Sequence, residues 1–191
     1  MKLHIFMMIC LGFVLSFFLC GCEAIQEFLE ESEEAEYSEN PNSESFKPRY
    51  IITVCTIVKY PRAGDLEQEL QGVDGSRIWV NTNQNFSSKN IRDAQIVPRP
   101  GDPNVCDLKF KLDRLGKLQW QILAGNHIDK PVAFIVDGLY YTSFIPEPPV
   151  SDQSNWVTLR VGINPYTAKG IAKFAKKNYT YYNPSTSSWF K

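Results

Sequence analysis

The segment Pro131–Phe144 constrains the fold of this chain more than any other. Two runs rich in β-branched and aromatic residues, VAFIV and LYYTSF, are joined by Asp137 and Gly138 alone. An Asp-Gly pair between two such runs is typical of a type I′ turn, whose twist matches that of two antiparallel strands. The sequence therefore predicts a β-hairpin here, so the fold includes an antiparallel sheet.

Three further segments have the composition of strands. Ile51–Val58 is β-branched and almost continuously apolar, which is typical of a central strand. Val105–Leu112 alternates from Cys106 onward between apolar and charged side chains, which indicates a strand with one exposed face. Trp156–Val161 and Arg77–Asn81 are shorter strands, with Pro61–Ser76 as a loop that contains one helical turn.

Two segments have the spacing of amphipathic helices. Within Asp113–Asn126 the residues Leu115, Leu118 and Ile122 recur at i, i+3 and i+7, which predicts a helix that buries this stripe. Asp113 suits the N-cap position. Thr167–Lys177 places four small or aliphatic residues on one face, Ala168, Ile171, Ala172 and Ala175.

A shorter helix is expected within Phe86–Ala94, with a serine as its N-cap. Because hairpins and separate helices occur together, the expected class is α+β. We expect a mostly antiparallel sheet with two or three helices packed on one face.

The N-terminus has the pattern of a secretory signal. Lys2 precedes an apolar run over positions 5 to 19, and the run ends at Leu19-Cys20-Gly21-Cys22. This ending resembles the lipobox of bacterial lipoproteins. The resemblance implies cleavage after residue 21, a diacylglycerol or palmitate-bearing Cys22, and an anchor on the extracytoplasmic face of the inner or outer membrane. Secretion without lipid and an uncleaved span are the alternatives, although the run is shorter than the ~20 residues a span needs.

Charge divides the rest of the chain into two parts. Residues 23–49 hold nine glutamates against Lys47 and Arg49, a net charge of −7. Low hydrophobicity with high net charge predicts an acidic, disordered stalk over residues 22–49. Residues 50–191 carry a net charge of +5 and suffice for one folded domain with a core.

The residues that carry chemistry are few. Beyond the signal there is one histidine, His127, and no zinc-type spacing or phosphate-binding loop. We therefore expect no catalysis, no metal and no cofactor, with an enzyme site that the sequence does not reveal as the alternative. A nucleic-acid partner is not expected for an extracytoplasmic domain. Cys55 and Cys106 either form a disulfide or are small buried residues.

Four pieces of the chain, in order, resemble the periplasmic head subdomain of SecD, a subunit of the bacterial protein-export machinery. The resemblance spans about residues 77–177 and implies an α+β head fold that contacts polypeptides. SecD also has transmembrane helices that couple export to the proton gradient, and this chain lacks them, so a binding module is the expected role. The matching pieces are Asn90–Ala94, Leu108–Trp120 with Gly116, Lys130–Thr142 and Thr167–Ala175.

The candidate partner-binding residues lie on the hairpin and on the last helix. Tyr140, Tyr141 and Phe144 form an aromatic arm on the second hairpin strand that suits strand addition or aromatic contact. Lys169, Lys173 and Lys176 form either a solvated face or a docking patch for an acidic partner. Export proteins or other envelope proteins are the expected partners. A sheet covered on both sides and a structural role in an envelope complex are the alternatives.

Overall fold

The computed structural model divides the chain into two compact units, Met1–Lys47 and Pro48–Lys191. It describes residues 41–43, 45–62, 64–83, 86–149 and 154–184. The signal, Cys22 and most of the stalk lie outside these ranges, so their predicted properties remain predictions. Among the described residues no helix is long and apolar enough to cross a bilayer.

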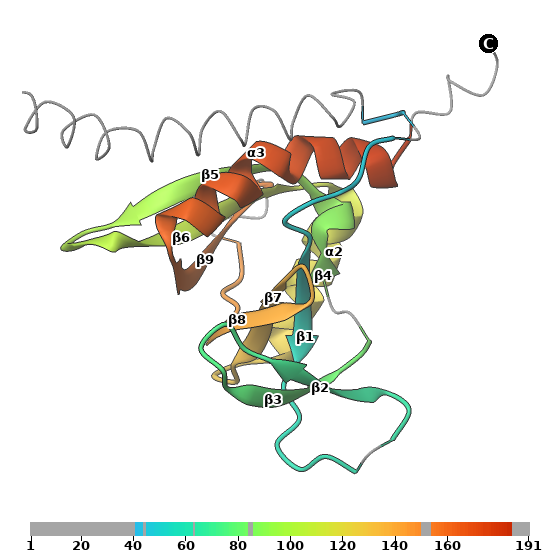
Figure 1. The fold of residues 1–191 in the computed structure, drawn as a ribbon, viewed down its shortest axis with the longest axis vertical. Helices are drawn as coiled ribbons and strands as arrows, with labels where there is room; N and C mark the ends of the chain where they lie inside the picture. Colours follow the sequence, from blue (N-terminus) through green and yellow to red (C-terminus); the bar gives the residue numbers. More distant parts are fainter. Residues whose placement is uncertain (1–40, 44, 63, 84–85, 150–153, 185–191) are drawn as a thin grey trace, which may run out of the picture. The chain divides into compact units, whose positions relative to one another are not determined.

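The second unit combines nine strands with a 3-10 turn and two helices (Figure 1). Every pair of neighbouring strands is antiparallel, which confirms the predicted α+β class with a mostly antiparallel sheet. The strands are β1 (Ile52–Thr56), β2 (Glu67–Gln71), β3 (Arg77–Asn81), β4 (Phe86–Ser87), β5 (Ile91–Arg99), β6 (Asp102–Leu112), β7 (Val132–Val136), β8 (Leu139–Phe144) and β9 (Trp156–Ile163); the helices are η1 (Ser88–Asn90), α2 (Arg114–Asn126) and α3 (Pro165–Tyr182).

The strands form three sheets. Four of them pair in the order β4-β1-β7-β8, three in the order β5-β6-β9, and β2 with β3 makes a separate hairpin. We call the first the four-stranded sheet and the second the three-stranded sheet. The predicted hairpin is β7–β8, and Asp137 and Gly138 have φ angles of 50° and 83°, as a type I′ turn requires.

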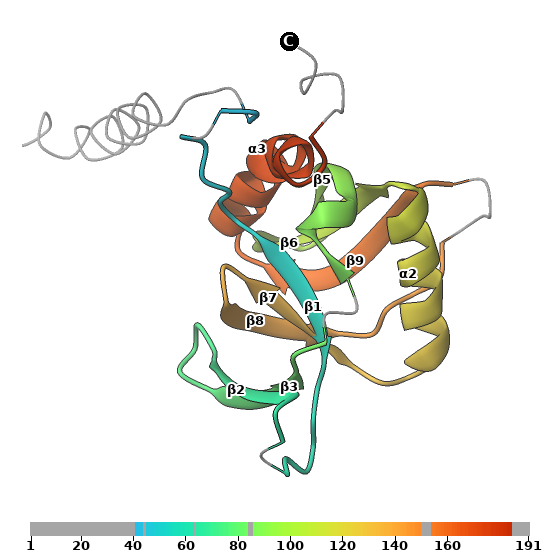
Figure 2. The same cartoon turned by 90° about the vertical axis from the view of Figure 1, so that its right-hand side faces the viewer.

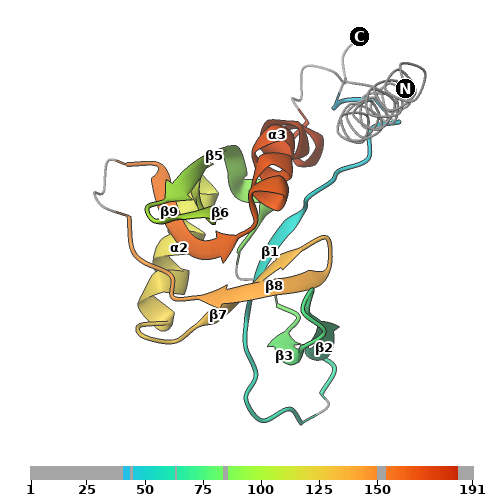
Figure 3. The same cartoon turned by 60° about the vertical axis from the view of Figure 1, so that its left-hand side comes forward.

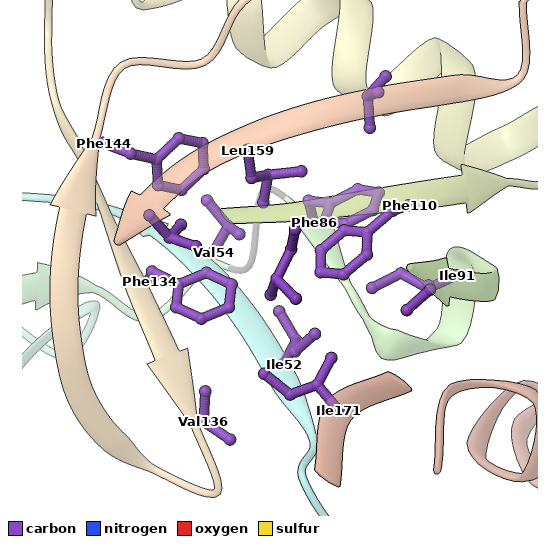
Figure 4. Close-up of a cluster of buried hydrophobic side chains, with 14 of the residues drawn as sticks. Ile52, Val54, Phe86, Ile91, Phe110, Phe134, Val136, Phe144, Leu159 and Ile171 are labelled. Atoms are coloured by element: carbon purple, nitrogen blue, oxygen red, sulfur yellow. The ribbon is translucent and has the colours of Figure 1, made fainter. Parts of the chain in front are cut away.

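The main core lies between the four-stranded and three-stranded sheets, and both helices contribute to it (Figures 2 and 4). Ile52, Val54 and Phe134 come from one sheet, while Phe110 and Leu159 come from the other. The alternation predicted for Val105–Leu112 is confirmed, since Leu108, Phe110 and Leu112 are buried and the charged residues between them are not.

A second, smaller core lies on the other side of the four-stranded sheet. There Cys55, Ala133 and Ile135 pack against Val80 of β3, together with Leu70 and Ile78. The four-stranded sheet is therefore covered on both faces, and every residue of its central strand β7 is buried.

The helix α2 forms where the sequence predicts it but buries the opposite face. The Asp113 side chain accepts a hydrogen bond from the Gly116 backbone amide, as the N-cap prediction requires. The face that packs inward carries Gly116, Trp120, Leu123 and Ala124. The predicted stripe is exposed instead: Leu115 by 55%, Leu118 by 53% and Ile122 by 54%.

Two local predictions were wrong because strand pairing with distant residues decides the conformation. The expected helix within Phe86–Ala94 reduces to the 3-10 turn η1, and Ile91 begins β5, which pairs with β6. The segment LEQEL, expected as a helical turn, forms β2 and pairs with β3.

The last helix is longer than predicted and buries the predicted face. Asn164 caps its first turn by accepting from the Thr167 amide, and Ala168, Ile171 and Ala175 are buried. Tyr179, Tyr181 and Tyr182 lie in its last turn. The residues beyond Pro184 lie outside the described ranges.

Candidate partner-binding surface

The aromatic arm, which belongs to β8, lies along the edge of the four-stranded sheet (Figure 3). β8 is paired with β7 on one side. On its other side the described residues make one isolated bridge, in which the Val73 amide donates to the Tyr140 carbonyl at 3.0 Å. Among the described residues, no strand pairs with the outer edge of β8 from Thr142 to Phe144.

A β-bulge marks the middle of this edge. Ile135 pairs with Tyr140 and Phe134 with Thr142, which leaves Tyr141 as the extra residue. A bulge bends the strand and re-aims the side chain beside it. Tyr140 packs against the second core and Tyr141 against the main core, and both tyrosines remain partly exposed.

Phe144 is a core residue, which corrects its assignment as a surface contact. Its side chain is 5% exposed and lies between two other aromatic rings. The ring centroid of Trp120 is 6.1 Å away in a stacked arrangement, and that of Phe134 is 6.2 Å away in an edge-to-face arrangement. The residues of the arm that a partner could contact are therefore Tyr140, Tyr141, Thr142 and Ser143.

The segment that follows the arm is held by α2. The indole Nε1 of the buried Trp120 donates to the carbonyl oxygen of Glu147 at 2.8 Å. This bond satisfies the only polar atom of the Trp120 side chain, and it fixes the proline-containing segment that follows β8. The end of β8 is thus fixed on one side by the Phe144 ring and on the other by Glu147.

The turn of the arm fixes the start of β1. Both carboxylate oxygens of Asp137 accept backbone hydrogen bonds, from the Tyr50 amide at 2.9 Å and the Ile51 amide at 2.7 Å. The Asp137 amide donates in return to the Ile51 carbonyl at 2.9 Å. The Asp137 carboxylate therefore holds the start of β1 against the turn.

The three lysines project from one exposed face of α3, which fits a solvated face as well as a docking patch. Lys169, Lys173 and Lys176 are exposed, and the helix packs its other face against β5, β6 and η1. Lys176 Nζ lies 3.6 Å from a carboxylate oxygen of Asp93 on β5. Because the lysines sit over the three-stranded sheet and the arm is the edge of the other sheet, the two candidate groups do not form one surface.

A further group of cations lies over an aromatic ring that no local sequence pattern places beside them. Lys109 and Lys111 of β6 lie over the ring of Trp156 on β9, with Nζ to centroid distances of 5.5 Å and 6.0 Å. The alternation of β6 places both lysines outward, but only the pairing of β6 with β9 places the tryptophan beside them. The outer face of the three-stranded sheet is therefore cationic around one aromatic residue.

The His127 ring is held in place by contacts from both of its nitrogens. Its Nδ1 lies 3.0 Å from the Leu123 carbonyl oxygen, so this nitrogen carries the proton and donates. Nε2 lies within hydrogen-bonding distance of the Thr56 hydroxyl oxygen, at 3.1 Å. The ring caps the end of α2 and lines a pocket of about 440 Å³ with Lys59, Asp129 and Lys130. Among the described residues no cluster of three or more metal-ligating side chains occurs.

The two cysteines are free thiols in the structure. Cys55 belongs to the second core and Cys106 to the main core, so each is a small buried residue. Burial raises the pKa of the Cys55 thiol to about 11, which disfavours the reactive thiolate.

Comparison with known proteins gives a likeness of fold. No family profile and no characterised protein matches the sequence. Two solved structures are similar over 68% of this chain, each with 14% identity and a TM-score of 0.47. One is SecDF in its super-membrane-facing form, and the other is a SecDF described as a membrane component that enhances protein export. The matched region covers 19% of the first chain and 63% of the second, less than two thirds of either.

Proposed function

We propose that this protein is a non-catalytic, lipid-anchored envelope protein whose folded domain binds polypeptide segments at the edge of β8. The observation that carries the proposal is the outer edge of β8 from Thr142 to Phe144, which pairs with no strand among the described residues and is preceded by two partly exposed tyrosines. Strand addition at such an edge supplies main-chain hydrogen bonds, and aromatic side chains add contact area. The resemblance of four ordered motifs to the SecD head supports the same role.

The open edge is short, so the tyrosines carry part of the binding. A net hydrogen bond contributes about 0.5–1.5 kcal/mol, and three residues supply only one or two of them. The affinity for a single segment is therefore expected to be weak. Weak, sequence-tolerant binding suits a protein that contacts many extended chains or a short segment of one envelope protein.

The test measures binding of a reduced, alkylated polypeptide that cannot refold, by fluorescence anisotropy with the full chain. Tyr141→Glu and Ser143→Glu place a charge beside the open edge and should weaken binding at least tenfold. Tyr60→Glu is the matched control, because Tyr60 is 84% exposed and belongs to the segment between β1 and β2 rather than to β8. Equal binding by all four proteins, or no binding by the unaltered chain, contradicts the proposed site.

The lipid anchor requires a separate test because Cys22 lies outside the described residues. Cells that express the full chain are labelled with a palmitate analogue and fractionated. The proposal expects label on the protein and its recovery with membranes, and both should be lost in Cys22→Ser. A Cys22→Ser variant that remains with membranes at high pH would instead favour an uncleaved span.

The absence of catalysis is part of the proposal and rests on the roles that the polar residues already have. His127 is held by two hydrogen bonds, Asp113 caps α2, and Asp137 fixes the start of β1. Any turnover by the purified protein that disappears in His127→Asn would contradict it.

The alternative, a structural component of an envelope complex, is favoured by one observation. The outer face of α2 exposes three aliphatic side chains at helical spacing. Soluble surfaces rarely align such residues without a partner.

A further inference from the structure

The outer face of α2 has the pattern of a helix-helix contact, and no other helix of the described part of the chain covers it. Leu115, Leu118 and Ile122 stand at i, i+3 and i+7, the spacing of the a and d positions in a coiled-coil seam. At 100° per residue, these three side chains point roughly opposite to the buried face around Trp120 and Leu123. α2 therefore has two apolar faces, and the core uses only one of them.

The charges of α2 specify the partner further. Arg114 and Lys117 lie in its first turn, and the whole helix Arg114–Asn126 contains no acidic residue. On a helix surface, residues that flank an apolar seam choose the partner by charge. A partner helix with carboxylates beside its own apolar stripe would meet Arg114, which flanks the seam, and no acidic residue within Arg114–Asn126. Asp113, the N-cap, lines the adjoining pocket and is the carboxylate that the partner would have to avoid.

A pocket lies at the N-terminal end of this seam. It has a volume of about 320 Å³ and is lined by Leu115 and Gln119 of α2, Lys89 of η1 and Tyr182 of α3, among others. The Gln119 side-chain oxygen is buried without a hydrogen-bond partner. A large side chain with a hydrogen-bond donor would fill this space and satisfy that oxygen.

We propose that the seam Leu115, Leu118 and Ile122 docks an amphipathic helix of another protein, one whose apolar stripe is flanked by carboxylates. The partner helix places its stripe on the seam and an anchor side chain in the pocket beside Leu115. The site is separate from the edge of β8, so this proposal goes beyond strand addition and stands or falls independently of it.

A second copy of this chain fits the seam less well. Three half-exposed aliphatic side chains bury far less than the ~800 Å² per partner of a stable dimer. A second α2 would also bring no carboxylate to face Arg114. An acidic partner helix supplies both the additional contact in the pocket and the complementary charge.

The test uses a synthetic amphipathic helix with leucine at the seam positions and glutamate beside them, together with a copy in which every glutamate is lysine. Binding to the full chain is measured by fluorescence anisotropy. The glutamate peptide should bind with a Kd in the micromolar range, and the lysine peptide at least ~10-fold more weakly. Equal affinities, or no binding of either peptide at millimolar concentration, overturn the proposal.

Variants locate the contact. Leu118→Glu should weaken binding of the glutamate peptide at least tenfold. Val73→Glu should leave that binding unchanged, because Val73 is equally exposed (54%) but lies in the turn between β2 and β3. Arg114→Glu should reverse the preference and favour the lysine peptide. Circular dichroism and the thermal midpoint show that each variant is folded, and Leu118→Ala serves as the milder substitution.

Two other occupants would give different results. If the seam joins two copies, sedimentation without peptide shows a dimer that Leu118→Glu dissociates. If it contacts lipid, the chain binds vesicles of anionic lipid and Leu118→Glu abolishes that binding. Either result overturns the proposed partner helix. Loss of unfolded-polypeptide binding in Tyr141→Glu, with peptide binding unchanged, shows that the two sites are independent.

Discussion

At the scale of single residues, the most distinctive positions of the sequence have structural partners. Asp137 accepts from two amides at the start of β1, which explains an aspartate in a turn that asparagine also suits. Gly116 lets the first turn of α2 approach η1, because a Cβ at this position would meet Asn90 at 2.6 Å. Asp137 and Gly116 therefore each hold two separate segments of the domain together.

Gly170 is the clearest case of a position where a tertiary contact requires the absence of a side chain. It lies inside α3, where glycine is about 1 kcal/mol less favourable than alanine. A Cβ there would collide with the Tyr50 ring, which also packs 5.8 Å from the Phe174 ring, centroid to centroid. We expect Gly170→Ala to lower the free energy of unfolding by about 1–2 kcal/mol, measured by urea titration, because the cost of overpacking exceeds the gain in helix propensity.

Two further variants separate the collision from the helix propensity. In a Tyr50→Ala background the collision is gone, so Gly170→Ala should stabilise by up to about 1 kcal/mol. Gly125→Ala is the matched control, since Gly125 lies in α2 with open space around it. A Gly170→Ala variant that is more stable than the unaltered chain would show that Tyr50 does not contact the helix.

At the scale of elements, the periodicity of apolar residues predicts that α2 is a helix but does not predict which of its faces is buried. The stripe of Leu115, Leu118 and Ile122 is a better apolar pattern than Gly116, Trp120, Leu123 and Ala124, yet the second set is buried. The reason is Trp120, whose ring fits between Phe86 and Phe144, with the Phe86 centroid 5.2 Å away. Those two phenylalanines belong to distant parts of the chain, so no local pattern in α2 identifies the fit.

This assignment of faces predicts opposite effects for two leucines of α2. Leu123→Ala should destabilise the domain by about 2–5 kcal/mol, since it leaves a cavity in the core. Leu118→Ala should change the free energy of unfolding by less than about 0.5 kcal/mol because the side chain is half exposed. Urea unfolding followed by circular dichroism measures both, and a large effect of Leu118→Ala would mean that the helix is rotated.

The arm shows how much of a candidate site a sequence can specify. Its hairpin, its turn type and its tyrosines follow from local residues. Which aromatic side chain remains accessible does not, because Phe144 is buried by Trp120 of α2 and the bulge at Tyr141 arises from pairing with β7. Likewise, the cations around Trp156 follow from the register of β6 with β9.

At the scale of the whole domain, the four-stranded sheet is the centre of stability. It is covered on one face by the main core and on the other by the β2–β3 hairpin, and all of β7 is buried. Native-state hydrogen exchange should therefore show β7 amides opening only with global unfolding. The amides of β2 should open locally at lower free energy, because all five of its side chains are at least partly exposed. Equal protection of both strands would contradict this order.

The sequence by itself determined the α+β class, the β7–β8 hairpin with its turn, both long helices and the alternation of β6. Each of these depends on neighbouring residues, through turn conformation, capping or side-chain period. The tertiary structure alone decided that two sheets enclose the core, that Ile91 and Glu67 begin strands, and which face of α2 is exposed. Those outcomes depend on contacts between residues far apart in the chain, whose energies are not encoded in any local pattern.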